Sequence, residues 1–116
     1  MALAVSAQTP NVTGTYKVTW IPAGNSKPNL VTLADFGGVL NGIYTADSGE
    51  ACPVTGTHTV NKVNFQVTCS KFTINMDGVV SLDAYTITGT YTSPQFQSGG
   101  FTMEIQTCMI PEGCKQ

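Results

Sequence analysis

Apolar and polar residues alternate with a period of two along most of the chain. From Val12 to Trp20, one face carries Val, Gly, Tyr, Val and Trp, while the other carries Thr and Lys. This alternation is typical of a β-strand with one buried face and one exposed face. None of the segments between such stretches is predicted to be helical. The pattern predicts eight strands, at 12–20, 30–36, 39–46, 54–60, 63–69, 72–82, 85–91 and 101–105.

The connections between these stretches are short and rich in turn-forming residues. Short connections make consecutive strands antiparallel. An antiparallel series of eight strands is most simply closed into an up-and-down β-barrel, because closure removes both sheet edges. The alternative is a β-sandwich of the Greek-key type, whose signature of a Trp packed on a disulfide is absent. Asp77-Gly78 is a strong hairpin signal inside the sixth stretch, so the hairpin there stays ambiguous.

Composition narrows the classes of function. Thr and Val supply about a quarter of the chain, 10 % of the residues are charged, and every basic residue is Lys. A net charge of -2 without Arg argues against nucleic-acid binding, which needs a basic surface to neutralise phosphates. The apolar share of 41 % argues against disorder, and the abundance of poor helix formers argues against a helical bundle. No apolar stretch approaches the length of about 18 residues expected of a membrane helix.

The positions expected to face inward on the predicted strands carry many aromatic side chains and almost no charged ones. His58, the only His, is expected inward, but a catalytic His needs an orienting carboxylate. By phase or loop position nearly all acids point outward, and none is expected on the inner face; the seven are Asp35, Asp47, Glu50, Asp77, Asp83, Glu104 and Glu112. Since nucleophile motifs and phosphate-binding loops are also missing, we expect no catalytic residue and no cofactor. The residues expected inside are Tyr16, Trp20, Tyr44, His58, Phe65, Phe72, Tyr85, Tyr91, Phe101 and Met103.

Four Cys in a short chain with little charge indicate an oxidising compartment, so we expect a secreted, periplasmic or cell-surface protein. A two-residue turn at Asn61-Lys62 would place Val54 opposite Cys69, with Cys52 diagonally adjacent. This predicts a Cys52–Cys69 disulfide. The remaining pair, Cys108 and Cys114, flanks a turn-forming insert and is predicted to form a second bridge. A metal site is not expected, because there is no Cys-x-x-Cys pair and only one His.

Both ends of the chain are predicted to lie outside the barrel. Residues 1–8 are interpreted either as the remnant of a leader, since Val5-Ser6-Ala7 fits the small-residue rule before a cleavage site, or as a flexible N-terminus. Residues 9–107 are predicted to form a single β-barrel domain. Residues 108–116 are predicted to be a tail hooked back by its disulfide.

A four-residue pattern recurs, in which a Gly is followed two positions later by an aromatic or imidazole ring on the same inner face. A Gly inside a strand needs a reason, such as tight coiling or the close approach of another backbone or a ligand. The ring is also expected to lean over the space that the Gly leaves. The four copies are 13–16, 41–44, 55–58 and 88–91.

These segments resemble the avidin and streptavidin family and, more loosely, the wider calycin group of small ligand-binding barrels. The resemblance is carried by 13–16, 40–46, 53–57 and 65–68, about a third of the chain, in the order in which that family uses them. It implies a barrel in which Tyr44 matches a biotin-contacting Tyr. Biotin itself is disfavoured, because the chain has a single Trp, Cys69 stands where the family has another Trp, and Ala46 stands where the family has a hydroxyl.

The sequence therefore favours a secreted bacterial binding module that holds a small, mostly apolar, uncharged ligand at the open end of the barrel, under a loop formed by 93–100. The alternative is a structural, self-assembling extracellular protein that uses its Thr-rich outer surface, which makes a homo-oligomer possible. A barrel cyclase or isomerase is a third, weaker hypothesis. The candidate ligand-binding residues are Tyr16, Trp20, Tyr44, His58, Phe65 and Tyr91.

Overall fold

The computed structural model describes residues 11–21, 29–82, 85–95 and 98–106. Within them the chain forms eight strands and no helix, so the described part contains no helical segment able to cross a membrane. The predicted leader segment and the predicted Cys108–Cys114 bridge lie outside the described residues. The strands are β1 (Gly14–Ile21), β2 (Asn29–Phe36), β3 (Val39–Thr45), β4 (Ala51–Thr59), β5 (Lys62–Thr68), β6 (Thr73–Val80), β7 (Thr86–Thr92) and β8 (Gly99–Ile105).

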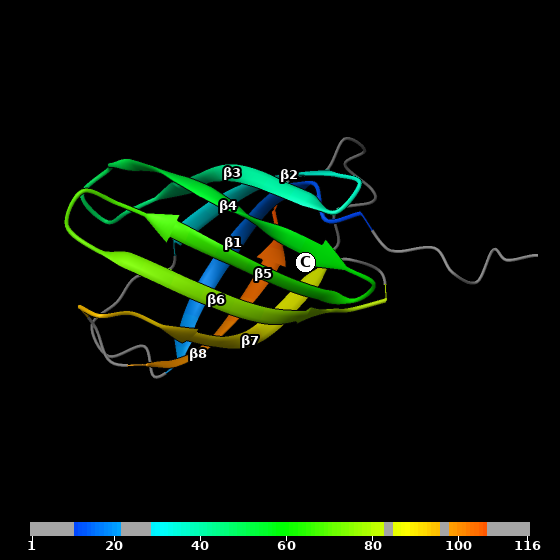
Figure 1. Ribbon diagram of the computed structural model, residues 1–116. Helices are drawn as coiled ribbons and strands as arrows, with labels where there is room; N and C mark the ends of the chain where they lie inside the picture. The colour runs from blue at the N-terminus through cyan, green and yellow to red at the C-terminus, as the bar shows by residue number, and fades with distance from the viewer. Residues whose placement is uncertain (1–10, 22–28, 83–84, 96–97, 107–116) are drawn as a thin grey trace, which may run out of the picture.

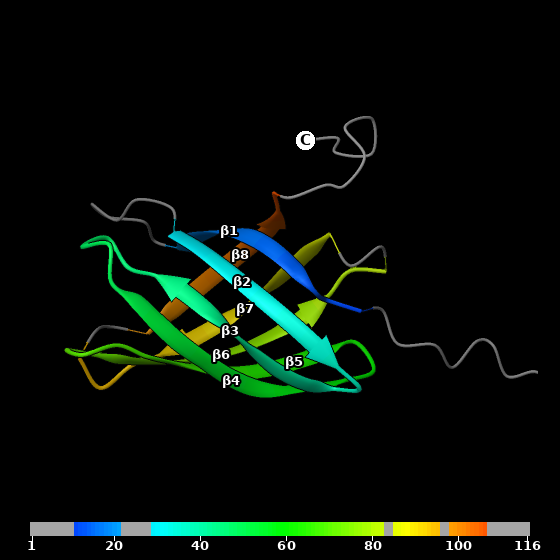
Figure 2. The same cartoon turned by 90° about the horizontal axis from the view of Figure 1, so that it is seen from above.

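Each strand pairs antiparallel with the next, and β8 pairs with β1 to close the barrel (Figure 1). The predicted up-and-down β-barrel is therefore confirmed, and the sandwich alternative is wrong. Viewed from above, β2 lies in front of β8 and crosses it steeply, as expected for the tilted strands of a small barrel (Figure 2).

The barrel has two ends with different connections. At the closed end, Gly37-Gly38 joins β2 to β3, Val60-Asn61 joins β4 to β5, and a longer connection joins β6 to β7. At the open end β1 ends at Ile21 and β2 begins at Asn29, and the described segments 46–50, 69–72 and 93–95 lie there. Every residue of the candidate site can be placed relative to these two ends.

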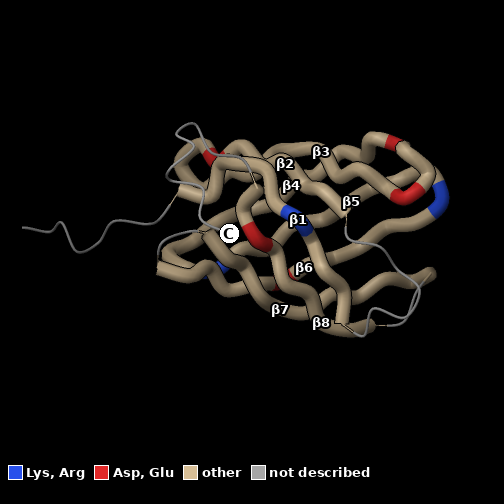
Figure 3. Tube along the Cα trace, turned by 180° about the vertical axis from the view of Figure 1, so that it is seen from behind, with Lys and Arg blue, Asp and Glu red and all other residues tan. Residues whose placement is uncertain are grey.

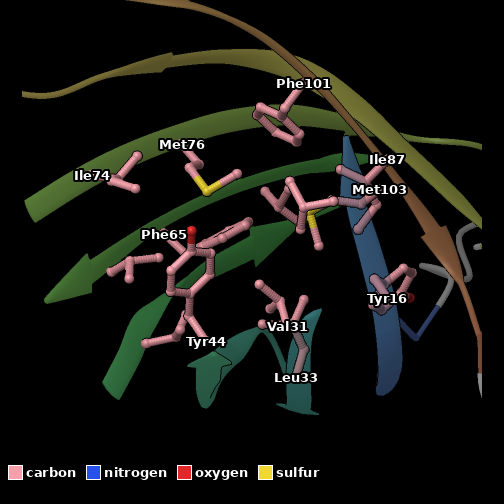
Figure 4. Packing of buried hydrophobic residues seen from close by; sticks show 14 of the residues in the cluster. Tyr16, Val31, Leu33, Tyr44, Phe65, Ile74, Met76, Ile87, Phe101 and Met103 are labelled. Carbon is pink, nitrogen blue, oxygen red and sulfur yellow. The ribbon is translucent and has the colours of Figure 1, made fainter. Parts of the chain in front are cut away.

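The inward-facing side chains fill the middle of the barrel with apolar groups from all eight strands (Figure 4). Alternation of buried and exposed positions is strict on β4 and β5 except at Gly56, as the period-two pattern predicts. The expectation that Tyr85 faces inward is wrong: its side chain is 48 % exposed, and Leu82, at the end of the preceding predicted strand, is 98 % exposed. The reason is that β6 ends at Val80 and β7 begins at Thr86, so both residues belong to the connection.

The β4–β5 hairpin turns one residue earlier than predicted. Thr59 pairs with Lys62, so the turn residues are Val60 and Asn61, and Val60 adopts a left-handed backbone conformation with φ of 55°. An unfavourable conformation for a β-branched residue requires compensation, which the His58 side chain supplies by bonding to the Val60 carbonyl.

The shifted register brings the strand ends that carry Cys52 and Cys69 directly opposite each other. Val54 pairs with Val67 instead of Cys69, and two residues further on the two Cys meet with Cα atoms 4.8 Å apart. The predicted Cys52–Cys69 disulfide is confirmed, although the pairing from which it was inferred is off by two residues.

Asp77-Gly78 does not form a turn, since β6 continues through it. Gly78 faces inward and pairs with Gly89 of β7. At Gly89 a side chain would collide with the Asp77 carbonyl on the neighbouring strand, and at Gly42 it would collide with the Thr32 carbonyl. These glycines therefore permit a close approach of two backbones, and the expectation that a ring leans into their space is wrong there.

Candidate functional site

A cavity of about 730 Å³ opens at the open end of the barrel. This volume is within the range of small-molecule sites. Its floor and walls are aromatic or aliphatic, and its rim is polar. The lining residues are Trp20, Asn29, Tyr44, Ala46, Asp47, Ser48, Glu50, Ser70, Lys71, Phe72, Ile74, Tyr91 and Gln95.

Three aromatic rings from three different strands meet in this cavity. The Trp20 and Tyr91 ring centroids are 5.0 Å apart with the planes at 74°, and the Trp20 and Tyr44 centroids are 6.4 Å apart with the planes at 68°. Both pairs have the edge-to-face geometry that aromatic rings prefer. The Trp20 ring is therefore in contact with both tyrosine rings, and the plane of each tyrosine is steeply inclined to the plane of the indole.

Asn29 holds Trp20 in this orientation. The Trp20 indole N–H donates to Asn29 Oδ1 over 2.8 Å, and Asn29 Nδ2 donates to the Thr45 carbonyl and to Asp47 Oδ1, at 3.1 and 2.8 Å. Both amide hydrogens and the amide oxygen of Asn29 are thus engaged. The same side chain fixes a ring on the cavity wall and a carboxylate on the rim.

Tyr44 offers an unsatisfied hydroxyl to the cavity. Its side chain is only 4 % exposed, and its hydroxyl has no hydrogen-bond partner among the described residues. Since every fully enclosed side-chain oxygen or nitrogen in the described part has a partner, this oxygen must be open to the cavity. Figure 4 shows the ring rising from β3 with the oxygen at its inner end. Burial, with a smaller contribution from Asp47, raises the pKa of Tyr44, so its hydroxyl stays neutral and can donate.

The rim is tied together at two places. Glu50 accepts hydrogen bonds from the Ser70 amide and hydroxyl, at 2.9 and 3.1 Å, and the Cys52–Cys69 disulfide links the same two connections. On the β7–β8 side, Gln95 Oε1 accepts from the Thr73 amide over 3.1 Å and lines the cavity. Of the predicted 93–100 loop, Gln95 lines the cavity, while Gly99 and Gly100 belong to β8.

At the closed end, the buried side chains of Asp35 and His58 are paired with each other and with backbone groups of the described residues. His58 Nδ1 lies 2.6 Å from Asp35 Oδ2, and Nε2 lies 2.9 Å from the Val60 carbonyl oxygen. Asp35 also accepts from the Val12 and Gly38 amides, at 3.2 and 3.1 Å. The expectation that no acid lies on the inner face is therefore wrong: Asp35 is only 6 % exposed and shares the inward phase of β2.

The ionisation of Asp35 follows from the groups that donate hydrogen bonds to it. Burial pushes the pKa of Asp35 up, but the hydrogen bonds from His58 and the two amides outweigh it, so the pKa lies below its ordinary value. Both ring nitrogens of His58 lie against acceptors, a carboxylate oxygen on one side and a carbonyl oxygen on the other. With both nitrogens engaged, His58 has no free lone pair to act as a general base.

Tyr16 belongs to the same end. Its hydroxyl donates to the Val12 carbonyl over 2.9 Å, and burial together with the nearby Asp35 charge raises its pKa to about 12. The six predicted ligand-binding residues are thus divided. Trp20, Tyr44 and Tyr91 meet at the open end, Tyr16 and His58 lie at the closed end, and Phe65 packs in the core between them.

Sequence reasoning missed Asn29 and Asp47 as parts of the site. For Asn29 a signal exists, because it occupies an inward position in the series that continues with Val31, Leu33 and Asp35. A polar residue at such a position needs a buried partner, and here the partner is the indole N–H of Trp20. Asp47 lies in a loop, where no periodicity applies.

Glu50, Cys52 and Cys69 place three potential metal-ligand atoms within 4.8 Å of one another. The two sulfur atoms are bonded to each other, however. A disulfide sulfur is not the thiolate that zinc requires, so this cluster is a structural cross-link.

Comparison with models of known protein families finds no match, and neither does a search of curated proteins. The resemblance to the avidin and streptavidin family therefore stays a sequence-based expectation. What the structure shows is the barrel and the position of Tyr44 and Ala46 on the wall of its cavity.

Proposed function

We propose that this protein is a secreted binding module that takes the body of a small, mostly apolar molecule into the open end of its barrel. The observation that carries the proposal is the Tyr44 hydroxyl, a neutral donor and acceptor that is deep in the cavity and has no partner among the described residues. Because this hydroxyl is open to the cavity, it is available to a ligand for a hydrogen bond, which contributes about 0.5–1.5 kcal/mol net. The aromatic walls supply apolar contact area, and the disulfide is compatible with an oxidising compartment.

Titration with the neutral dye Nile red tests this proposal. Ala46 lines the cavity and is 8 % exposed, so Ala46→Trp should fill the mouth and weaken dye binding by at least about tenfold. Ala51→Trp is the matched control, because Ala51 is exposed at the same end but does not line the cavity. Thermal unfolding of both variants verifies that they fold. Equal dye binding by the wild type and Ala46→Trp would contradict the proposal.

A second candidate function is self-assembly through the outer surface. Across the outward-facing positions of β2, β3 and β4 the described residues carry no charge, and four large apolar side chains there are 45 % exposed or more: Leu30, Phe36, Val39 and Ile43. Charged positions, coloured in Figure 3, occur elsewhere, including Lys17 on β1 and Glu104 on β8. Such a patch marks a contact surface in many proteins.

Analytical ultracentrifugation over a range of concentrations tests self-assembly. If the β2–β4 face associates, Phe36→Lys should shift the protein to monomer, whereas Thr88→Lys on the outer face of β7 should not. A wild type that stays monomeric at millimolar concentration rules this function out.

A further inference from the structure

The rim of the cavity carries more negative than positive charge. Among its described residues Asp47 and Glu50 are acidic and only Lys71 is basic. Lys71 is exposed and makes no ion pair with another described residue, so it does not neutralise either carboxylate by direct contact. An anionic ligand would meet two like charges at this mouth.

Some hydrogen-bonding groups of the cavity already have partners within the protein, and others do not. The Trp20 indole N–H is taken by Asn29, the Asn29 amide is saturated, and Glu50 is held by Ser70. Asp47 is exposed and keeps its second carboxylate oxygen without a partner in the described part. Asp47 therefore offers a ligand a negatively charged acceptor at the edge of the aromatic wall.

The aromatic wall itself has the electrostatics of a cation site. The faces of Trp and Tyr rings are negative and attract ammonium groups within about 6 Å. Because the Trp20 ring is steeply inclined to both the Tyr44 and the Tyr91 ring, the three rings do not form a flat stack and instead line a corner. A methylated ammonium group suits such a corner, since it has few or no N–H donors and gains from ring faces.

We propose that the ligand of the open-end cavity carries a methylated ammonium group, which lies against Trp20, Tyr44 and Tyr91 with Asp47 as its counter-charge. This inference rests on the proposed binding function and specifies its ligand class. It replaces the uncharged ligand that the sequence favoured. That expectation had Asp47 in a polar loop and pointing outward, whereas Asn29 holds it at the mouth.

Choline and 3,3-dimethylbutan-1-ol test the charge of the ligand, because they share one shape and differ in replacing the ammonium nitrogen by carbon. Calorimetric or NMR titration of the full chain should show choline binding about tenfold more tightly than the neutral alcohol. Asp47→Asn should lower choline affinity severalfold and leave the alcohol unaffected. Glu104→Gln, which removes an exposed carboxylate on β8 away from the mouth, should change neither.

The outcomes separate this inference from the proposed function. Equal binding of choline and the alcohol, or binding of Nile red with no binding of choline, overturns the ammonium assignment and leaves a neutral binding cavity. Failure of choline, the alcohol and Nile red together overturns the binding function as well. A choline preference that survives Asp47→Asn unchanged overturns the role of Asp47.

Discussion

The two ends of the barrel bury polar groups in opposite ways. At the closed end, Asp35, His58 and Tyr16 have their side-chain polar atoms bonded within the fold. At the open end, Tyr44 is buried to a similar extent, yet its hydroxyl has no partner among the described residues. Aromatic and titratable residues occur at both ends, so residue type does not distinguish them. The two ends differ in how completely their polar side chains are hydrogen-bonded. This difference indicates a structural role for the closed end and a binding role for the open end.

This contrast predicts that substitutions at the closed end change stability, whereas those at the open end change binding. The largest effect is expected for Asp35→Ala, which leaves the buried Nδ1 of His58 without its carboxylate partner. Removing one partner of a buried pair costs about 3–5 kcal/mol of unfolding free energy, measured by urea denaturation. Asp77→Ala removes an exposed carboxylate of β6 and is the control, expected to cost less than about 1 kcal/mol. Similar losses in the two variants would show that the Asp35–His58 pair is not what stabilises the closed end.

Removal of the disulfide is expected to have the next largest effect, and it concerns the open end. Cys52→Ala combined with Cys69→Ala opens a loop with a sequence separation of 17 and should cost about 3 kcal/mol. The Glu50–Ser70 hydrogen bonds remain, so the rim should retain part of its order. Alkylation before reduction provides a check on the wild type, because Cys52 and Cys69 should then be unreactive. Labelling of either residue would contradict the disulfide.

Lowering the pH should reduce the unfolding free energy by less than the preceding substitutions do, because a protonated Asp35 side chain still occupies its place at the closed end. The pKa of Asp35 is lowered in the folded protein, so its contribution is fully present above the unfolded value of about 3.9 and is lost as the pH falls through the folded value. Unfolding free energies measured from pH 6 downward should therefore decline below about pH 4. In Asp35→Asn this part of the decline should be missing, and an unchanged pH profile would refute the assignment.

The smallest effects come from a matched pair of hydroxyl deletions. Tyr16→Phe breaks the hydrogen bond to the Val12 carbonyl and should cost about 1 kcal/mol. Tyr44→Phe removes a hydroxyl with no described partner and should change stability by less than about 0.5 kcal/mol, while lowering ligand affinity. Thermal unfolding and Nile red titration of both variants give the comparison. Loss of stability in Tyr44→Phe equal to that in Tyr16→Phe would mean that the two ends do not differ.

Period-two alternation was enough to predict the eight strands and the closed barrel, because one-sided burial leaves that pattern in any antiparallel sheet. It also placed Trp20, Tyr44 and Tyr91 correctly on the inner face. It could not place Asp35, since a buried acid needs a partner, and His58 is 23 positions away along the chain. Turn chemistry misplaced the β4–β5 hairpin by one residue, because it does not register contacts such as the one between the His58 side chain and the Val60 carbonyl in the turn that forms.

Alternation also carries no information on which end of a strand faces the mouth. Tyr16 and Trp20 lie on one face of β1, four residues apart, yet one is at the closed end and the other lines the cavity. For this reason the six predicted ligand-binding residues were correctly expected inside but are not brought together. Separating them required the order of the connections, and that follows only from the closed topology.

The position of Trp20 has a practical consequence for spectroscopy. It is the single Trp of the chain, it lies on the cavity wall, and its indole N–H is fixed by Asn29. Intrinsic fluorescence excited near 295 nm, roughly where only indole absorbs, therefore originates at the mouth and nowhere else. An unlabelled sample thus contains its own fluorescent reporter of cavity occupancy. The wavelength of maximum Trp20 emission should differ between a cavity that is empty, one that contains water and one that contains a ligand.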